Sequence, residues 1–173
     1  MLRTVHTADL EPAERAALRA FLEECFDGRF DAEDWDHTLG GLHVLAHDQG
    51  ELVAHGSVVQ RRVVHEGRAY RAGYVEGVAV RADRRRRGYG GRVMAALERI
   101  VDRAYDFGAL SASDAGAPLY TGRGWSVWPG RLAALGPQGL VPLPEEEGTT
   151  YVRPLPGAGR GRLDFDWRDG DVL

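Results

Sequence analysis

Apolar residues recur at helical spacing in two segments of the chain. The first follows a start at Asp9 or Pro12, and its stripe consists of Leu18, Phe21, Leu22, Cys25 and Phe26. The second covers 90–105, and its stripe consists of Val93, Met94, Leu97, Ile100, Val101 and Ala104. Such a stripe buries one face of a helix, so two amphipathic helices are predicted, the first ending at Gly28.

The pattern between these helices is typical of strands. Apolar and β-branched runs cover 42–45, 52–62 and 69–81, and turn residues separate them at 48–50 and 66–67. Runs of this kind joined by short turns predict an antiparallel meander. Residues 29–38 are expected to form an acidic loop or a short helix.

The third predicted strand combines a carboxylate with two glycines. Alternation places Tyr74, Glu76, Val78 and Val80 on one face of it. Gly73 and Gly77 interrupt the run, and a glycine inside a strand often marks a bulge or a close approach of backbone.

The remaining segments are shorter. A strand is expected at 109–111, a short helix from Pro118 through Tyr120, strands at 125–128 and 149–153, and a long connection over 129–148. Together the elements predict an α+β fold with a mixed, mostly antiparallel sheet flanked by helices. We expect a single domain over 1–173, in which 154–173 is a C-terminal tail that docks back onto the rest of the domain.

Composition narrows the class of protein. The chain is 43% hydrophobic and 28% charged, ordinary globular values. No apolar run approaches a membrane span, and residues 1–6 lack the apolar core of a signal peptide, so a cytoplasmic location is expected. Cys25 is the only cysteine, which excludes an internal disulfide. His37, His43 and His55 show no metal-ligand spacing, so no metal is expected and structural roles are assigned to them.

Charge is distributed unevenly around a net value of −4. Residues 23–36 hold seven acids and 140–173 hold another seven, whereas 81–92 contain six arginines and one acid. One basic loop and two acidic stretches could bind an anion and a cation side by side, although solvated surface charge is the simpler explanation for any single acid. All 22 basic residues are arginine, so the arginines of the loop are less distinctive than they first look.

The basic loop Arg85–Gly91 stands between a predicted strand and a predicted helix. Glycines there let backbone N–H groups face an anion, and the helix N-terminus adds partial positive charge. The chain has no lysine, which excludes a Walker loop, and the hairpin-linked strands and glycine spacing argue against a dinucleotide fingerprint. An ordinary turn with surface arginines is the alternative.

The motif Arg85-x-x-Gly88-x-Gly90, placed after Val78-Ala79-Val80, resembles the pyrophosphate loop of the GNAT superfamily of N-acetyltransferases. The order of the predicted elements is similar to that fold over about 5–155. A closer resemblance, from the N-terminus to the last residues, is to the aminoglycoside 2′-N-acetyltransferases. It is carried by Asp34-Trp35-x-His37-Thr38-Leu39-Gly40-Gly41, Gln60-Arg61-Arg62, the segment 73–83, Gly108-Ala109-Leu110-Ser111 and Asp166-Trp167-Arg168-x-Gly170-Asp171-Val172.

The resemblance implies roles for individual residues. Acetyl-CoA would be held by Val78, Ala79, Val80, Arg85, Arg86, Arg87, Gly88, Tyr89, Gly90 and Gly91. The acceptor site would be lined by Asp34, Glu76, Gly77, Ser111, Glu146, Asp171 and the terminal carboxylate of Leu173. Glu76 would be the general base, directly or through water, and Tyr120 would protonate the departing thiolate.

These roles suit the chemistry of acetyl transfer to an amine. The amine arrives as ammonium and must lose a proton, and a polycationic amino sugar needs carboxylates around its site. Surface placement of Glu76 and core packing of Tyr120 are the structural alternatives. The expected partners are such an amino sugar and a second copy of the chain, without nucleic acid or membrane. Acetylation of another cellular amine and a degenerate acetyl-CoA-binding module are the competing functions.

Overall fold

The computed structural model describes residues 1–154, 156–157 and 159–173. These residues form two compact units. The first comprises Met1–Val59 and Val75–Ile100, and the second comprises Gln60–Tyr74 and Val101–Leu173. Two long strands, β3 and β4, and the helix α3 therefore contribute residues to both units. No helix among the described residues is long and apolar enough to span a bilayer.

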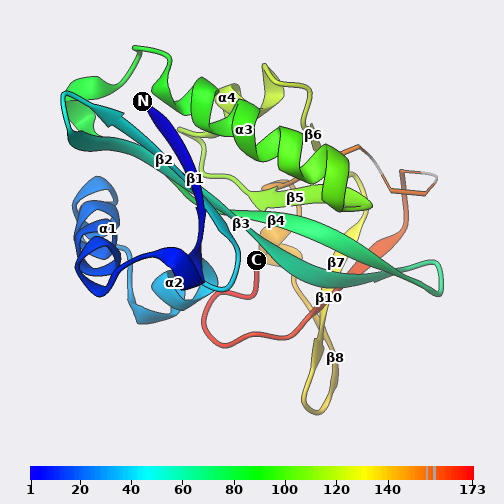
Figure 1. Cartoon of the computed structure of the whole chain (residues 1–173). Coiled ribbons are helices and arrows are strands. Elements are labelled where there is room, and N and C mark those ends of the chain that lie inside the picture. The colour runs from blue at the N-terminus through cyan, green and yellow to red at the C-terminus, as the bar shows by residue number, and fades with distance from the viewer. Residues whose placement is uncertain (155, 158) are drawn as a thin grey trace. The chain divides into compact units, whose positions relative to one another are not determined.

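The first unit contains a layer of strands with helices (Figure 1). Its elements are β1 (Leu2–His6), α1 (Pro12–Cys25), α2 (Ala32–His37), β2 (Leu42–Asp48), β3 (Glu51–His65), β4 (Arg68–Val80) and α3 (Tyr89–Ala104), with short 3-10 turns at Thr7–Asp9 and Ala82–Arg84. β1 pairs with β2 and β2 with β3, both antiparallel. A capping box at Glu11 and Glu14 and a proline at the first turn begin α1.

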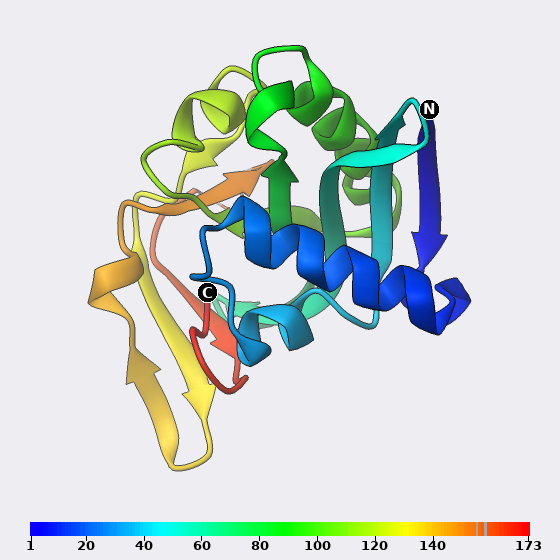
Figure 2. The same cartoon turned by 90° about the vertical axis from the view of Figure 1, so that its left-hand side faces the viewer.

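The two faces of this layer are covered by different helices. α1 crosses the strands on one face (Figure 2), and its buried stripe Leu18, Phe21 and Leu22 belongs to one core cluster with Val5, Leu45 and Ala79. α3 covers the opposite face, where Leu97 and Val93 approach so closely that a Cβ on Gly56 would lie 2.8 and 2.9 Å from their methyl groups. Gly56 is therefore required for the close packing of α3 on β3.

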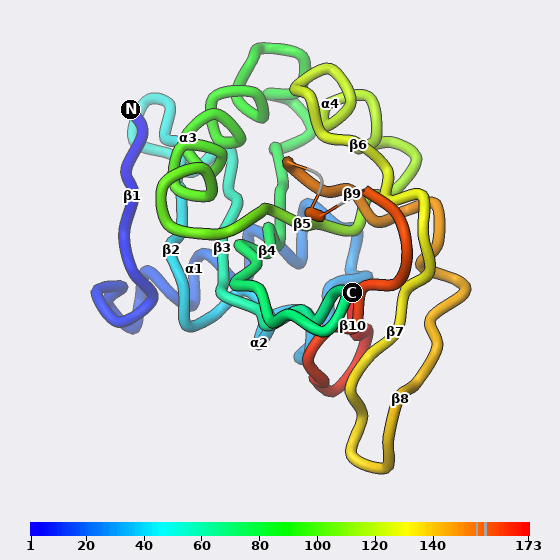
Figure 3. The backbone as a smooth tube through the Cα atoms, turned by 90° about the vertical axis from the view of Figure 1, so that its right-hand side faces the viewer, coloured from blue at the N-terminus to red at the C-terminus, as the bar shows by residue number. Residues whose placement is uncertain are grey.

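The second unit is built on the other halves of the long strands (Figure 3). Its further elements are β5 (Phe107–Ser111), α4 (Ala117–Thr121), β6 (Ser126–Val127), β7 (Arg131–Gly136), β8 (Gly139–Pro142), a 3-10 turn (Pro144–Glu146), β9 (Thr150–Arg153) and β10 (Arg162–Asp166). β5 runs parallel to β4 and antiparallel to β9, whereas β10 lies between β3 and β7, antiparallel to the former and parallel to the latter. The sheet is thus mixed and mostly antiparallel, which confirms the predicted class.

Several predicted elements are confirmed and others are corrected. Both amphipathic helices, the β2–β3 hairpin and the short helix with Tyr120 form as expected. The long connection predicted over 129–148 is wrong, because it contains the β7–β8 hairpin. The loop and tail over 154–173 include a further strand, β10, and residues 2–6 form β1, which the sequence did not indicate. β1 has a single buried residue, Val5, so its pattern carries little signal.

The C-terminal tail is fastened to the second unit by Arg61. The Arg61 side chain is only 4% exposed, and its Nε donates to Asp166 Oδ1 at 2.7 Å. Its other nitrogens donate to the carbonyls of Asp166 and Val172. The guanidinium also lies over the rings of Tyr74 and Phe165, 5.1 and 5.2 Å from their centroids. One planar cation therefore holds β10 and the final residues against β3 and β4.

Replacing Arg61 tests this anchor. Arg61→Lys keeps the charge but loses the planar fork, so we expect the free energy of unfolding to fall by about 2 kcal/mol. Urea unfolding measures the change, and hydrogen exchange should show weaker protection of the last residues. Arg62→Lys, one position along the strand with an exposed side chain, is the matched control and should leave both unchanged. Equal effects of the two substitutions would contradict the anchor.

Candidate functional site

The proposed catalytic carboxylate Glu76 stands beside a kink in β4. Gly77 has φ +55°, a left-handed conformation inside a strand, and this interrupts the regular alternation around it. The carbonyl of Gly77 lies 2.8 Å from His55 Nδ1, and that of Glu76 accepts from Ser57 Oγ at 3.4 Å. Two successive carbonyls of β4 thus meet side chains of β3. The glycine that was predicted to mark a bulge or a close approach takes a conformation that other residues rarely adopt, and Glu76 itself is half-buried.

The basic loop has the geometry of an anion cradle. Arg86 and Gly88 both adopt positive φ, 59° and 80°, in a turn that leads directly into α3 at Tyr89. The first amides of a helix have no carbonyl partner within it, so those of 89–91 are available at the start of a 16-residue helix. Gly88 is exposed, and nothing lies within 4 Å of where its Cβ would be. This segment fits a pyrophosphate bound through backbone N–H groups.

The arginines around the loop have different partners. Arg81 bridges Asp83 at 2.8 Å and Glu51 at 3.0 Å, and these hydrogen bonds raise its pKa. Arg84 lies 3.5 Å from Asp83, and Arg85 Nε donates to the Val80 carbonyl at 3.2 Å. These contacts brace the turn against the end of β4.

Tyr120 lies in α4 in the second unit. It is 7% exposed, and its ring meets those of Trp125 and Tyr151 at centroid distances of 6.5 and 6.1 Å. Pro118 stands near the start of this short helix. The ring is therefore held in one orientation by aromatic packing, which suits both a positioned proton donor and a core residue.

Ser111 and Glu146 are brought together in the second unit. Ser111 Oγ donates to Glu146 Oε2 at 2.9 Å, and Thr149 Oγ1 donates to the same oxygen at 3.2 Å. Two neutral hydroxyls thus orient this half-buried carboxylate at the end of β5. Both residues were assigned to the acceptor site from the resemblance, and the structure brings their side chains into contact.

The other acidic candidates occupy different elements. Asp34 lies in the first turn of α2, where Asp31 accepts from its amide at 2.9 Å and Asp34 Oδ2 accepts from the Asp31 amide at 3.0 Å. Asp34 therefore stabilises the helix start as well as carrying a negative charge. Asp171 is exposed and Leu173 is 7% exposed at the end of the anchored tail.

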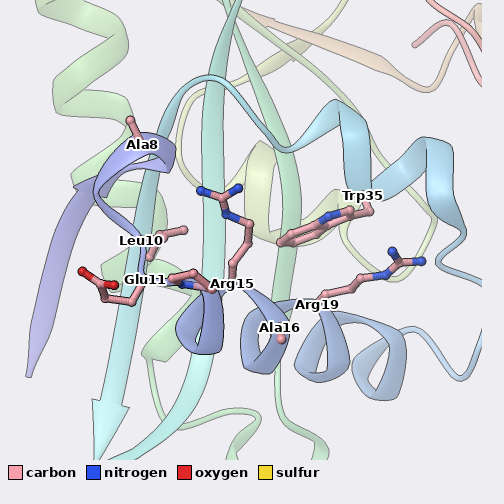
Figure 4. A pocket seen from close by; sticks show the side chains of 8 residues that line it. Ala8, Leu10, Glu11, Arg15, Ala16, Arg19 and Trp35 are labelled. Atoms are coloured by element: carbon pink, nitrogen blue, oxygen red, sulfur yellow. The ribbon is translucent and has the colours of Figure 1, made fainter.

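A cavity of about 530 Å³ opens beside α1 in the first unit (Figure 4). Its lining residues are Ala8, Leu10, Glu11, Pro12, Arg15, Ala16, Arg19 and Trp35. Two guanidiniums and one carboxylate line it, so a polycation would be repelled there. The predicted substrate residues do not line this cavity, although Trp35 follows Asp34 directly.

Two buried histidines were assigned only structural roles from the sequence. His43 Nδ1 and His55 Nε2 are 3.0 Å apart, and neither residue is exposed. Burial lowers the pKa of His43 to about 4, and burial together with the neighbouring His43 lowers that of His55 to about 3. Both imidazoles are therefore neutral near pH 7. The signal in the sequence was two histidines on the apolar face of one hairpin.

Comparison with known proteins identifies the class. Residues 2–128 match the model of the acetyltransferase (GNAT) domain. The chain belongs to this family, which confirms the predicted fold and places it among the acetyltransferases.

One relative is similar over nearly the whole chain. It is an aminoglycoside 2′-N-acetyltransferase from Mycolicibacterium fortuitum, 43% identical over 98% of this chain and 90% of the relative. Among solved structures, a GNAT family N-acetyltransferase (YhbS) from Escherichia coli in complex with CoA has a TM-score of 0.64 at 17% identity, covering 95% of this chain and 88% of that one. An acyl-CoA N-acyltransferase from Pseudomonas aeruginosa has a TM-score of 0.59 at 20% identity, covering 88% and 98%. These two structures support the fold alone.

The buried histidine pair predicts a loss of stability in mild acid. Unfolding returns each pKa toward 6.5, so below that pH the unfolded chain binds protons that the folded chain does not. The free energy of unfolding should therefore fall on acidification from pH 6.5 to about pH 5, by up to about 1.4 kcal/mol per pH unit for each histidine.

Urea unfolding across this pH range measures the slope. The His55→Asn variant should show a shallower slope because one buried histidine is gone. His47→Asn, a half-exposed position on β2, is the matched control. A wild-type slope in His55→Asn would contradict the assignment.

Proposed function

We propose that this chain transfers an acetyl group from acetyl-CoA to the 2′-amino group of an aminoglycoside. The observation that carries the proposal is the near full-length similarity to the M. fortuitum aminoglycoside 2′-N-acetyltransferase. It is supported by the loop suited to pyrophosphate and by the oriented carboxylates in both units.

Acetyl-CoA supplies a thioester that an amine can attack directly, forming a C–N bond as the C–S bond breaks. We assign its pyrophosphate to the amides of Arg86, Arg87, Gly88, Tyr89, Gly90 and Gly91, and its pantetheine arm to the backbone of Val78, Ala79 and Val80, with Arg85 bracing the loop. The N–H of Val78, just after the kink, is the proposed donor to the negative oxygen of the transition state.

Two side chains are proposed to move protons. The Glu76 carboxylate takes a proton from the substrate ammonium, directly or through water, so that the amine can attack. The Tyr120 hydroxyl gives a proton to the sulfur of the departing thiolate and regains one from the newly acylated nitrogen, which loses it to become a neutral amide. No covalent bond to the protein forms in this scheme, and burial raises the pKa of the lone Cys25 thiol to about 11, which keeps it unreactive.

The acceptor is proposed to be recognised through negative charge. Asp34, Gly77, Ser111, Glu146, Asp171 and the carboxylate of Leu173 are the assigned contacts. Carboxylates and hydroxyls are suited to the ammonium and hydroxyl groups of an amino sugar.

We also propose a homodimer. The β7–β8 hairpin exposes Leu135, Leu140 and Val141, between 38% and 45% each. β8 ends the strand order on its side of the sheet, and an exposed apolar edge is prone to pair with another chain.

A substrate panel tests the function. Purified protein with acetyl-CoA should release free thiol in the presence of aminoglycosides that carry a 2′-amine. Matched compounds with a 2′-hydroxyl should give no product acetylated at that position. Mass spectrometry and NMR of the products locate the new amide. Silence across the 2′-amines would refute the proposal, and acetylation confined to unrelated amines would favour a different acetyltransferase.

Replacing Glu76 tests the base. Glu76→Gln retains size and polarity but cannot accept the proton, so we expect kcat/KM to fall by about 10²-fold or more, most strongly at low pH. Steady-state kinetics across pH measure the effect. Glu66→Gln, an exposed carboxylate at the β3–β4 turn, is the control. A wild-type pH profile in Glu76→Gln would remove this residue as the base.

A further inference from the structure

A continuous hydrogen-bonded line of side chains crosses the strands of the first unit. Thr7 Oγ1 lies 2.8 Å from His43 Nε2, His43 Nδ1 lies 3.0 Å from His55 Nε2, and His55 Nδ1 lies 2.8 Å from the Gly77 carbonyl. Thr7 follows β1, and the others belong in turn to β2, β3 and β4. The three side chains are at most 8% exposed.

The carbonyl at one end fixes the direction of every hydrogen bond. A carbonyl only accepts, so His55 Nδ1 must carry its hydrogen. In a neutral imidazole the other nitrogen then accepts, which requires His43 to carry its hydrogen on Nδ1 as well. His43 Nε2 accepts in turn from the Thr7 hydroxyl. Only one set of tautomers satisfies the whole line.

The far end of the line meets the loop that follows α2. The Gly40 amide donates to Thr7 Oγ1 at 3.0 Å, and the Thr7 amide donates to the Gly41 carbonyl at 3.0 Å. α2 carries Asp34, one of the residues assigned to the acceptor. Thr38, which ends α2, also closes over the kink, because a Cβ on Gly77 would lie 3.1 Å from its methyl group.

The line cannot deliver a proton to Glu76, because it ends on a carbonyl that has none to pass on. Its effect is geometric. The hydrogen bond from His55 sets where the Gly77 carbonyl points. That carbonyl shares one planar peptide with the Val78 N–H, and Glu76 is the residue bonded to Gly77 on its other side. His55 thus gives the partly buried Gly77 carbonyl a hydrogen-bond donor at the point where the backbone takes a left-handed conformation.

We propose that the Thr7–His43–His55 line is a positioning relay for the reaction: it holds the Gly77 kink, and through it Glu76 and the Val78 amide, in register with the loop after α2. The relay rests on the proposed function for its catalytic consequence. Its residues are positioning residues and touch no reacting atom.

The tautomers give a test that needs no substrate. In the intact protein at pH 7, ¹⁵N NMR of the histidine rings should show both His43 and His55 protonated on Nδ1 and bare on Nε2. Either ring as the Nε2–H tautomer, or as imidazolium, would overturn the relay. The tautomers measured in this way do not depend on whether aminoglycosides are substrates, so a failure of the relay can be distinguished from a failure of the proposed function.

A matched pair of substitutions tests the catalytic consequence. Asparagine places its amide near the site of histidine Nδ1, so His55→Asn can still donate to the Gly77 carbonyl. Glutamine reaches only the Nε2 site, so His55→Gln loses that donor. We expect kcat to fall by about 10²-fold in His55→Gln and much less in His55→Asn, with a smaller change in KM for acetyl-CoA, because most of its assigned contacts lie beyond Val78.

The control is His47→Gln, on the same strand as His43 and outside the relay. All rates are normalised to the folded fraction, and any acceptor amine that the chain acetylates serves for the assay. Equal losses in His55→Asn and His55→Gln, or wild-type kcat in folded His55→Gln, would overturn the positioning role. If the variants do not fold, the tautomer measurement on the unaltered protein decides.

Discussion

The hydrogen bond between His55 and the partly buried Gly77 carbonyl is the interaction on which the proposed site in the first unit depends. Gly77 takes a left-handed conformation inside β4, and a buried backbone group left without a partner costs on the order of 1–3 kcal/mol. An imidazole is well suited to this task in a core, because neutral histidine can donate from one nitrogen and accept at the other. The kink that places the proposed catalytic groups is therefore inseparable from two histidines buried beneath α1.

The second unit meets the same constraint with a charged group. The tail presents carbonyls of Asp166 and Val172 to a region that is nearly closed to water, and Arg61 satisfies both while pairing with the Asp166 carboxylate. Burial lowers the pKa of Arg61, and the aromatic faces of Tyr74 and Phe165 flank it. A guanidinium stays charged under these conditions, so the anchor does not depend on pH in the neutral range.

Local patterns predicted the parts of the fold that have strong periodicity. The stripes of α1 and α3 and the turn between β2 and β3 were sufficient for the helices and the meander. The β7–β8 hairpin was missed because β8 is a short strand, exposed throughout, that has no alternating pattern. β10 was missed because its pairing with β3 joins residues about a hundred positions apart, which no local spacing encodes.

The site features that could be predicted from the sequence are those that depend on the type of a single residue. The loop and Gly77 are marked by glycines, whose backbone requirement is visible in the residue type. The assignment of Ser111 and Glu146 to the acceptor site came from the resemblance, whereas their contact is seen only in the structure, because 35 positions separate them in the chain. The relay was hidden because His43 and His55 become diagonal neighbours only in the observed register, where His43 faces Ser57 and His55 faces Leu45.

The partners of the carboxylates separate structural acids from candidates for binding a cation. Asp166, Asp83 and Glu147 each pair with an arginine, which offsets their charge. Glu146 and Asp34 instead accept from hydroxyls or a backbone amide, neutral donors that orient a carboxylate without cancelling its charge. A site for a polycation requires carboxylates whose charge is not offset by an arginine. The acidic residues best suited to an amino sugar are therefore those held by neutral groups, which the count of acids along the sequence could not distinguish from the rest.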